Sequence, residues 1–250
     1  MRKLLIASLA LNAGVLLAAA WFGFGPGRTA LLRGFLAAHQ TRLVSAFEAL
    51  PIAPDDVVFL GDSLTEGGPW EELFPDIRVR NRGIGGDTAD GVLLRLEQVT
   101  AGTPAKLFLM IGTNDLSRGE SEAEIVARIE QILERVKQES PDTELYVQSV
   151  LPRAAGYRDS VEGLNARLAE IAVEMGTGWV DLYPAFLDSE TGAIRSELSN
   201  DELHLLGPGY ILWRDQIEAL VRAGAAPTLG LPAEEAVELT PSDPPAGEGF

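Results

Sequence analysis

Length, composition and charge set the first limits on this chain. Its 250 residues are 46% hydrophobic and 23% charged, which is typical of a globular protein with one or two domains. The net charge of -17 argues against a nucleic-acid-binding protein, because no basic field exists to displace counterions from phosphates. The absence of cysteine excludes disulfides, thiolate nucleophiles and cysteine metal ligands.

The first segment of the chain has the pattern of an export signal or a membrane anchor. Arg2 and Lys3 precede an uncharged, mostly apolar run over residues 4–25, which is just long enough to cross a bilayer. Ala18-Ala19-Ala20 offers a small-residue cleavage site. The length of the run favours an uncleaved anchor over residues 1–27. The remainder would then lie outside the cytoplasm, in the periplasm or extracellular space, with cleavage and secretion as the second interpretation.

Three further regions follow the first segment. The pattern over residues 28–50 predicts an amphipathic helix that leads into a globular domain over residues 51–224. Residues 225–250 are acidic and rich in proline and glycine, and we expect them to be disordered. His39 falls within the apolar register of the lead-in helix, so we assign it no chemical role. The apolar positions of that helix are Leu32, Phe35, Leu36, Leu43, Phe47 and Leu50.

Short apolar runs alternate with helical patterns between residues 51 and 224. This alternation predicts an α/β domain with a doubly wound parallel sheet. Ser121 with Glu124 forms a capping box at the start of one helix, and residues 200–204 are expected to open the last one, which runs from Tyr210 to about Ala223. The predicted strands cover residues 57–60, 77–79, 107–111, 145–151 and 179–182.

Polar side chains follow the predicted strands or precede the last helix. Ser63, Gly86, Asn114 and the pair of Asp201 with His204 could meet at one edge, because parallel strands end on the same side of a sheet. Acyl transfer by serine needs a base, an acid that orients the base, and donors for the developing oxyanion. These positions supply each of those groups.

A serine mechanism would have one candidate base in this domain. His204 is the only histidine within residues 51–224. Asp201 lies three residues before it on a turn, near enough to accept a hydrogen bond from the imidazole and to fix its tautomer. Ser63 follows a four-residue apolar run, a glycine and an aspartate. Taken alone, the tripeptide Gly61-Asp62-Ser63 would more often be an ordinary loop whose Asp and Ser cap a helix.

Four sequence blocks resemble those of the SGNH, or GDSL, hydrolase family. They occur in the family order between about residues 57 and 210, and residues 81–88 are similar to the platelet-activating-factor acetylhydrolase and lysophospholipase-like branches. The resemblance implies a flavodoxin-like three-layer α/β/α sandwich around a five-stranded parallel sheet, and an esterase that needs no metal or cofactor. The blocks are Gly61-Asp62-Ser63-Leu64, Gly86 before Asp87-Thr88, Gly112-Thr113-Asn114-Asp115 and Asp201-x-x-His204.

The same resemblance assigns roles to the polar residues. Ser63 would be the nucleophile, His204 its base and Asp201 the acid that orients the base. The oxyanion hole would consist of the Ser63 N–H, the Gly86 N–H and the Asn114 side-chain amide. The remaining aspartates of the blocks are expected to shape loops instead of taking part in catalysis, namely Asp62, Asp87 and Asp115.

Other site chemistries fit the sequence less well. Gly83-x-Gly85 follows a strand as in a dinucleotide site, but Thr88 replaces the last glycine of that fingerprint. A metallophosphoesterase could use Asp62, Asp87, Asn114 and Asp115, although such centres usually hold several histidines. An acyltransferase to a sugar hydroxyl stays open because it uses the same acyl-enzyme. A non-catalytic binding domain is disfavoured by the intact blocks.

The expected substrate is a small-molecule, lipid or glycan ester with a short, acetyl-like acyl group. A long acyl chain needs an apolar channel, and no lid-sized insertion is visible to build one. The longest segment near the site, residues 185–199, holds few large apolar residues. A lysophospholipase or thioesterase that acts on longer chains is the alternative. Through the N-terminal segment the membrane is the other expected partner, and the sequence does not assign an oligomeric state.

Overall fold

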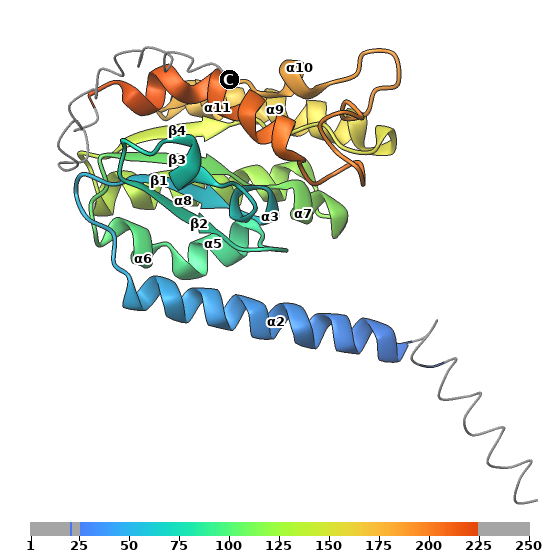
Figure 1. Ribbon diagram of the computed structural model, residues 1–250, viewed down its shortest axis with the longest axis horizontal. Helices are drawn as coiled ribbons and strands as arrows, with labels where there is room; N and C mark the ends of the chain where they lie inside the picture. Colours follow the sequence, from blue (N-terminus) through green and yellow to red (C-terminus); the bar gives the residue numbers. More distant parts are fainter. Residues whose placement is uncertain (1–20, 22–25, 225–250) are drawn as a thin grey trace, which may run out of the picture.

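The computed structural model describes residues 21 and 26–224 (Figure 1). The expected acidic tail over residues 225–250 lies outside the described residues, and so does nearly all of the expected anchor over residues 1–27. No helix within the described ranges combines the length and the apolar character needed to span a bilayer. The anchor and the disordered tail therefore stay predictions from the sequence.

The centre of the fold is a parallel sheet whose strands all end at the same edge. Val57 on the first strand pairs with Val79 on one side and with Lys106 on the other. Loops at the carboxyl edge of such a sheet are where ligands bind. The five strands pair in the order β2 (Val79–Gly83), β1 (Val57–Gly61), β3 (Lys106–Met110), β4 (Glu144–Gln148) and β5 (Gly178–Val180).

Successive side chains of β1 point to opposite faces of the sheet. Val58 and Leu60 pack into one hydrophobic cluster, whereas Val57 and Phe59 pack into another. All residues of β1 and β3 are buried, as expected for strands that helices cover on both faces. The predicted three-layer α/β/α fold with a five-stranded parallel sheet is therefore confirmed.

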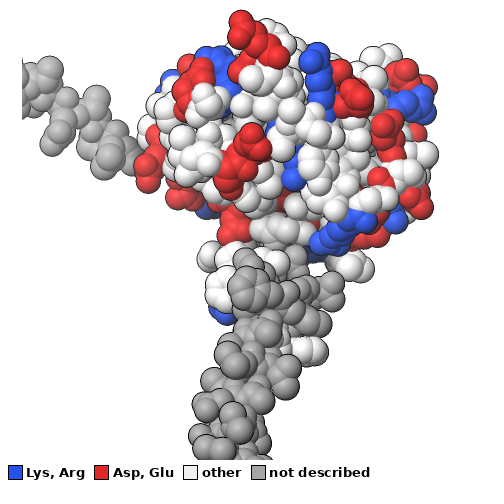
Figure 2. Space-filling model, turned by 90° about the vertical axis from the view of Figure 1, so that its right-hand side faces the viewer, with Lys and Arg blue, Asp and Glu red and all other residues white. Residues whose placement is uncertain are grey.

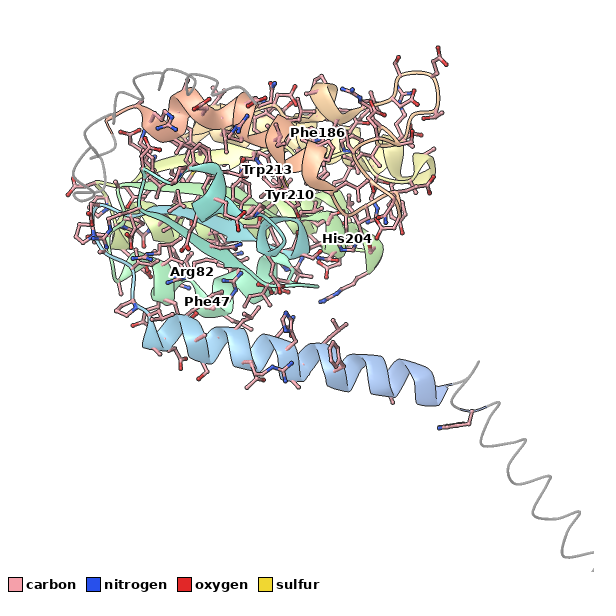
Figure 3. All side chains as sticks on the ribbon, viewed as in Figure 1. Phe47, Arg82, Phe186, His204, Tyr210 and Trp213 are labelled. Atoms are coloured by element: carbon pink, nitrogen blue, oxygen red, sulfur yellow. The ribbon has the colours of Figure 1, made fainter. Side chains whose placement is uncertain are left out.

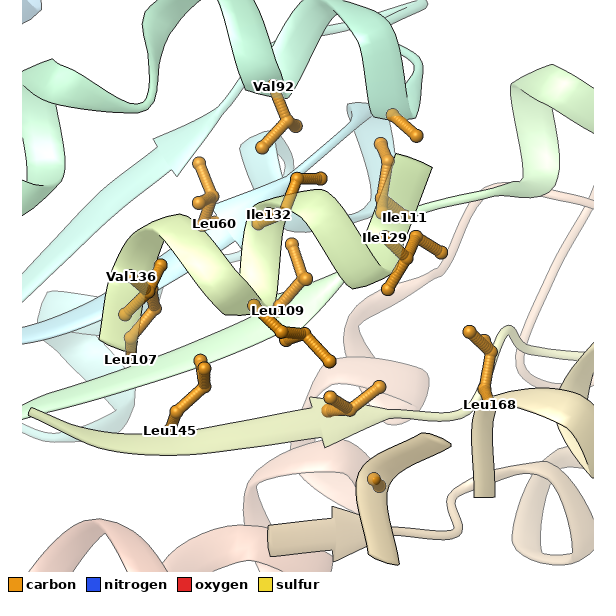
Figure 4. Packing of buried hydrophobic residues seen from close by; sticks show 14 of the residues in the cluster. Leu60, Val92, Leu107, Leu109, Ile111, Ile129, Ile132, Val136, Leu145 and Leu168 are labelled. Carbon is orange, nitrogen blue, oxygen red and sulfur yellow. The ribbon is translucent and has the colours of Figure 1, made fainter. Parts of the chain in front are cut away.

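Two helical layers enclose the sheet. Ile129, Ile132 and Val136 pack from one layer onto Leu107 and Leu109 (Figure 4). The capping box predicted at Ser121 is present at the start of that helix. The layer on this face contains α5 (Ala89–Arg95), α6 (Glu97–Thr100), α8 (Glu122–Glu139) and α9 (Arg158–Glu174). The opposite layer contains α4 (Trp70–Leu73), α10 (Tyr183–Phe186) and α11 (Gly207–Arg222). Two short helices, α3 (Ser63–Glu66) and α7 (Thr113–Ser117), follow β1 and β3.

The strand boundaries differ from the prediction, most clearly in the second and fourth strands. The second strand was expected at residues 77–79, but β2 begins at Val79, because Ile77 closes a tight turn in which its carbonyl accepts the Val79 N–H. The fourth was expected to reach residue 151, but β4 ends at Gln148. Beyond it, the Asn165 side chain bonds both the N–H and the C=O of Val150, so this backbone is satisfied without a neighbouring strand.

The lead-in helix is α2 (Pro26–Ala49), which lies along the α5 and α6 side of the domain and extends past the edge where α3 and α7 lie (Figure 1). Phe47 is buried beneath the Arg82 guanidinium, 4.6 Å from its ring centre (Figure 3). Phe35 and Leu36, however, are 67% and 45% exposed. The apolar side of this helix is therefore covered only where the helix contacts the domain.

Candidate active site

Ser63 is the first residue of α3 and stands two residues beyond the end of β1. The Asp62 side chain caps this helix, with its Oδ1 accepting the Leu64 N–H at 2.9 Å. The turn requires glycine at position 61, since a Cβ there would lie 2.3 Å from the Met110 carbonyl oxygen. The abrupt change from strand to helix leaves the Ser63 side chain at the carboxyl edge of the sheet.

Asp201 and His204 lie in a turn and not in the last helix. The sequence placed them on the turn that leads into that helix and expected the helix itself from Tyr210, whereas α11 begins at Gly207. The Asp201 Oδ1 accepts the backbone N–H groups of Leu203 at 3.1 Å and His204 at 2.7 Å. Glu202, which follows Asp201, has a left-handed φ of 61°. These local hydrogen bonds satisfy the N–H groups in a tight turn, so helical geometry starts later.

One chain of hydrogen bonds joins the serine, the histidine and the aspartate. Ser63 Oγ is 3.0 Å from His204 Nε2, and His204 Nδ1 is 2.7 Å from Asp201 Oδ2. Since a carboxylate only accepts, Nδ1 carries a proton and Nε2 of the neutral ring can accept the Ser63 hydroxyl. The structure thus brings these three predicted residues together, although Ser63 and His204 are 141 positions apart in the chain. His204 is labelled at this edge in Figure 3.

The Asp201 carboxylate stays ionised at neutral pH. Its pKa is lowered to about 2, first by the hydrogen bond from His204 and then by the backbone N–H groups of His204 and Leu203. Both side chains of the Asp201–His204 pair are about half exposed, at 50% and 48%. A negative charge is therefore available to orient the imidazole and to stabilise its protonated form.

Gly86 lies in the loop after β2, and Asn114 lies in α7, which follows β3. A Cβ on Gly85 would lie 3.9 Å from the Ser63 Cβ, so the loop after β2 packs against the serine. The Asn114 Nδ2 donates to the Asp87 carbonyl at 2.9 Å and has a second N–H that this bond does not use. Across residues 21 and 26–224, no acceptor is found for the N–H of Gly86 or Ser63. The three expected oxyanion donors thus have free N–H groups, and their role stays a prediction.

Three buried aspartates lie beneath these loops. Burial raises the pKa of Asp62 to about 7, and burial likewise raises the pKa values of Asp87 and Asp115. Asp87 forms an ion pair with Arg95 at 2.8 Å, and Asp115 accepts the Ala89 N–H at 3.1 Å. Their contacts fit the expected loop-shaping part. No group of three or more metal-ligating side chains occurs in the part of the chain that the structure describes.

Sequence reasoning missed two residues that contact the loop after β2 and a third that contacts one of them. Glu66 Oε2 accepts the Gly85 N–H at 2.5 Å, and Arg118 donates to the Gly86 carbonyl at 2.9 Å. His39, expected to be a packed residue of the lead-in helix, is half-buried and contacts Glu66 at 2.6 Å. The local sequence contained one signal for Glu66, since Ser63 and Glu66 have the spacing of a capping box. In the structure, however, Glu66 contacts Gly85, which is 19 positions away.

Comparison with known proteins gives matches over the same region. Residues 59–212 match the GDSL-like lipase/acylhydrolase family. Bovine platelet-activating factor acetylhydrolase IB subunit alpha1 (Bos taurus) is 31% identical over 166 residues, which cover 62% of this chain and 70% of the relative. A GDSL-like lipase from Bacteroides thetaiotaomicron has a similar structure, with a TM-score of 0.66 and 25% identity over 75% of this chain and 98% of that one.

Proposed function

Because this chain belongs to the GDSL-like lipase/acylhydrolase family and is therefore a hydrolase of ester bonds, we propose that it works as a serine esterase through Ser63, His204 and Asp201. The observation that carries this mechanism is the continuous hydrogen-bonded chain from Ser63 Oγ through the imidazole of His204 to Asp201. Such a chain can move a proton from the serine hydroxyl while the aspartate holds the ring in place.

The proposed reaction proceeds in two halves. His204 takes the Ser63 proton as Oγ attacks the ester carbonyl, and it returns that proton to the departing alcohol. Water then attacks the acyl-enzyme with His204 again as base, which releases the acid and restores Ser63. The N–H groups of Ser63 and Gly86 and the second N–H of Asn114 would stabilise the oxyanion in both halves.

A direct test labels the full chain with a fluorophosphonate probe and follows hydrolysis of p-nitrophenyl acetate. We expect the probe to attach at Ser63, and we expect Ser63→Ala and His204→Ala each to remove nearly all turnover. The double variant should lose little more, because the two residues act as one unit. Ser117→Ala, a hydroxyl on the nearby α7, is the matched control and should retain activity. Labelling that survives Ser63→Ala, or activity that disappears in EDTA, would contradict the mechanism.

The preferred acyl group is proposed to be short, and the ester to be part of a lipid or glycan. Among the large apolar residues of the segment near the site, Phe186, Ile194 and Leu198 are buried in the core, and Leu187 is partly buried and packs against it. They are therefore unavailable as walls of an acyl channel, which would need apolar contacts for each methylene. The name of the bovine relative, an acetylhydrolase, agrees with a short acyl group.

A series of p-nitrophenyl esters from acetyl to decanoyl tests the acyl preference. We expect the specificity constant to be highest between acetyl and butyryl and to fall for longer chains. A steady rise toward decanoyl would favour a lysophospholipase or thioesterase instead. Charge gives no strong selection, since acidic and basic side chains are interspersed with uncharged ones on the face viewed in Figure 2.

We also propose that the chain is held at a membrane with its catalytic domain outside the cytoplasm. The support comes from the sequence, because a basic start and an uncharged run over residues 4–25 have the length of a bilayer span. Fractionation of cells that express the full chain should place it with membranes, and protease added from outside should reach the domain. Recovery of a mature chain that starts at Trp21 would identify a cleaved signal instead.

A further inference from the structure

One carboxylate joins three separate parts of the molecule near the proposed site. Glu66 belongs to α3, the helix that begins with Ser63. Its Oε1 lies 2.6 Å from His39 Nε2 on α2, and its Oε2 accepts the Gly85 N–H at 2.5 Å. We call residues 85–87 the oxyanion loop, since Gly86 is its proposed donor. Glu66 therefore links the lead-in helix both to the serine helix and to the oxyanion loop.

The next peptide of the oxyanion loop also faces α2. Gln40 Nε2 lies 3.5 Å from the carbonyl oxygen of Gly85. In a trans peptide the C=O and the following N–H point in opposite directions. A Gly85 carbonyl directed at α2 therefore directs the Gly86 N–H away from α2. Since Gly85 packs against Ser63, the orientation of this single peptide determines where the proposed oxyanion donor points.

The oxyanion loop has little intrinsic stiffness. Gly85 and Gly86 are consecutive glycines, and Gly86 adopts a left-handed φ of 76° that glycine reaches easily but does not hold by itself. An oxyanion donor is effective only when it is already oriented before charge develops. The side chains that hold the neighbouring peptides must supply that orientation. On one side they are Glu66 and Gln40, and on the other Arg118, which donates to the Gly86 carbonyl.

We propose that His39, Gln40 and Glu66 are positioning residues that hold the oxyanion loop in its catalytic conformation. Full activity then requires α2 to be docked on the domain, although α2 lies outside the region that matches the family. His39 fixes the Glu66 carboxylate, Glu66 fixes the Gly85 N–H, and Gln40 orients the following peptide. This inference rests on the proposed serine mechanism, because it assigns these residues an effect on the oxyanion donor of that mechanism.

The central test compares Glu66→Ala with Glu66→Gln in the full chain. Alanine removes both contacts, and we expect kcat for p-nitrophenyl acetate to fall by about 10- to 100-fold with KM within about twofold. Glutamine should restore most of kcat, because its oxygen can accept the Gly85 N–H while its NH₂ group donates to the other tautomer of His39. His39→Ala leaves Glu66 in place and should have a smaller effect, about 3- to 10-fold.

A second readout separates loop orientation from general destabilisation. Boronic acids form a tetrahedral adduct on serine that uses the same oxyanion donors as the transition state. Their affinity for Glu66→Ala should fall by about the same factor as kcat. Glu218→Ala is the matched control, since it also removes a carboxylate but one that pairs with Arg222 within α11, away from α2 and the oxyanion loop. It should retain wild-type kcat and boronate affinity.

Several outcomes would overturn the inference. Glu66→Ala could retain kcat within about twofold, Glu66→Gln could be as impaired as Glu66→Ala, or Glu218→Ala could lower kcat as much. Ser63→Ala separates these results from a failure of the proposed function. If Ser63→Ala leaves turnover intact, the serine mechanism itself is wrong. If it abolishes turnover while Glu66→Ala has no effect, only the positioning role is wrong.

Discussion

Two aspartates near the same serine have opposite environments. Asp201 lies in an exposed turn, accepts hydrogen bonds from His204 and Leu203, and has a pKa lowered to about 2. Asp62 is adjacent to Ser63 in the chain but is 1% exposed, and burial raises its pKa to about 7. Its Oδ2 finds no hydrogen-bond partner among the described residues.

The difference shows that closeness to the serine does not decide which carboxylate orients a histidine. Hydrogen bonds from His204, Leu203 and Ser199, together with exposure to solvent, stabilise the charge of Asp201, so its carboxylate is ionised at neutral pH. Asp62 receives one backbone donor in a site that penalises charge. We therefore expect Asp201 to matter mainly for activity and Asp62 mainly for stability. Three predictions test that division, and a fourth tests the neighbouring Asn114.

The largest expected effect is the loss of activity in Asp201→Asn. An asparagine amide can favour the wrong tautomer of His204, so that Nε2 no longer accepts the Ser63 proton, and kcat should fall by about 10⁴-fold. Asp62→Asn should change kcat by less than about tenfold, because its Oδ1 can still accept the Leu64 N–H. Steady-state kinetics on p-nitrophenyl acetate measure both. Equal losses in the two variants would break the division.

The second prediction concerns the pH dependence of stability. The pKa of Asp62 is about 7 in the folded protein and 3.8 in the reference state, so the folded protein binds the extra proton between these values. Its contribution to the free energy of unfolding should therefore fall by about 4 kcal/mol as pH rises from about 4 to 7. Urea unfolding at several pH values should give a flatter curve for Asp62→Asn. Parallel curves would contradict the buried, protonated state.

The third prediction concerns Asn114, which is half-buried at the edge of the site. If its second N–H contacts the oxyanion, Asn114→Ala should raise the barrier by about 3 kcal/mol, or lower kcat about 100-fold. Ser117→Ala on the same short helix is the control and should stay within about threefold. An effect of Asn114→Ala below about threefold would remove Asn114 from the oxyanion hole.

The smallest expected effect is that of Asp201 on stability. Because its pKa is depressed, Asp201 contributes stability above pH 3.8, and this contribution is lost as pH falls toward 2. The side chain is half exposed and screened by water, so Asp201→Asn should change the free energy of unfolding at pH 7 by less than about 1 kcal/mol. A larger change, measured by urea unfolding, would make Asp201 structural as well.

Local patterns predicted the parts of the fold that depend on local physics. The apolar run over residues 57–60 identified a strand buried on both faces, and Ser121 with Glu124 identified a helix start. Parallel strands that end at one edge then predicted that Ser63 and His204 would meet. In the structure they are 3.0 Å apart, which agrees with this expectation.

Contacts between distant segments could not be predicted in the same way. Glu66 resembled a local cap, but its partners are Gly85 and His39, which belong to other elements. Asp201 was expected on the turn before the last helix, but its bonds to the backbone N–H groups of Leu203 and His204 use the same chemistry as a helix cap and were not predicted. A residue type that can cap a helix or close a turn is assigned only by its tertiary surroundings.

The pairing of Ser63 with His204 has a consequence for folding. These residues are 141 positions apart, and Tyr210 adds a hydrogen bond to the Leu64 carbonyl at 3.1 Å between the same two regions. Closing so long a segment is slow unless intervening elements have already formed. A nascent chain that ends before the last turn contains all five strands but lacks His204, the proposed base. If the proposed roles hold, we expect catalytic competence to be acquired late in folding, after the segment that carries Ser63.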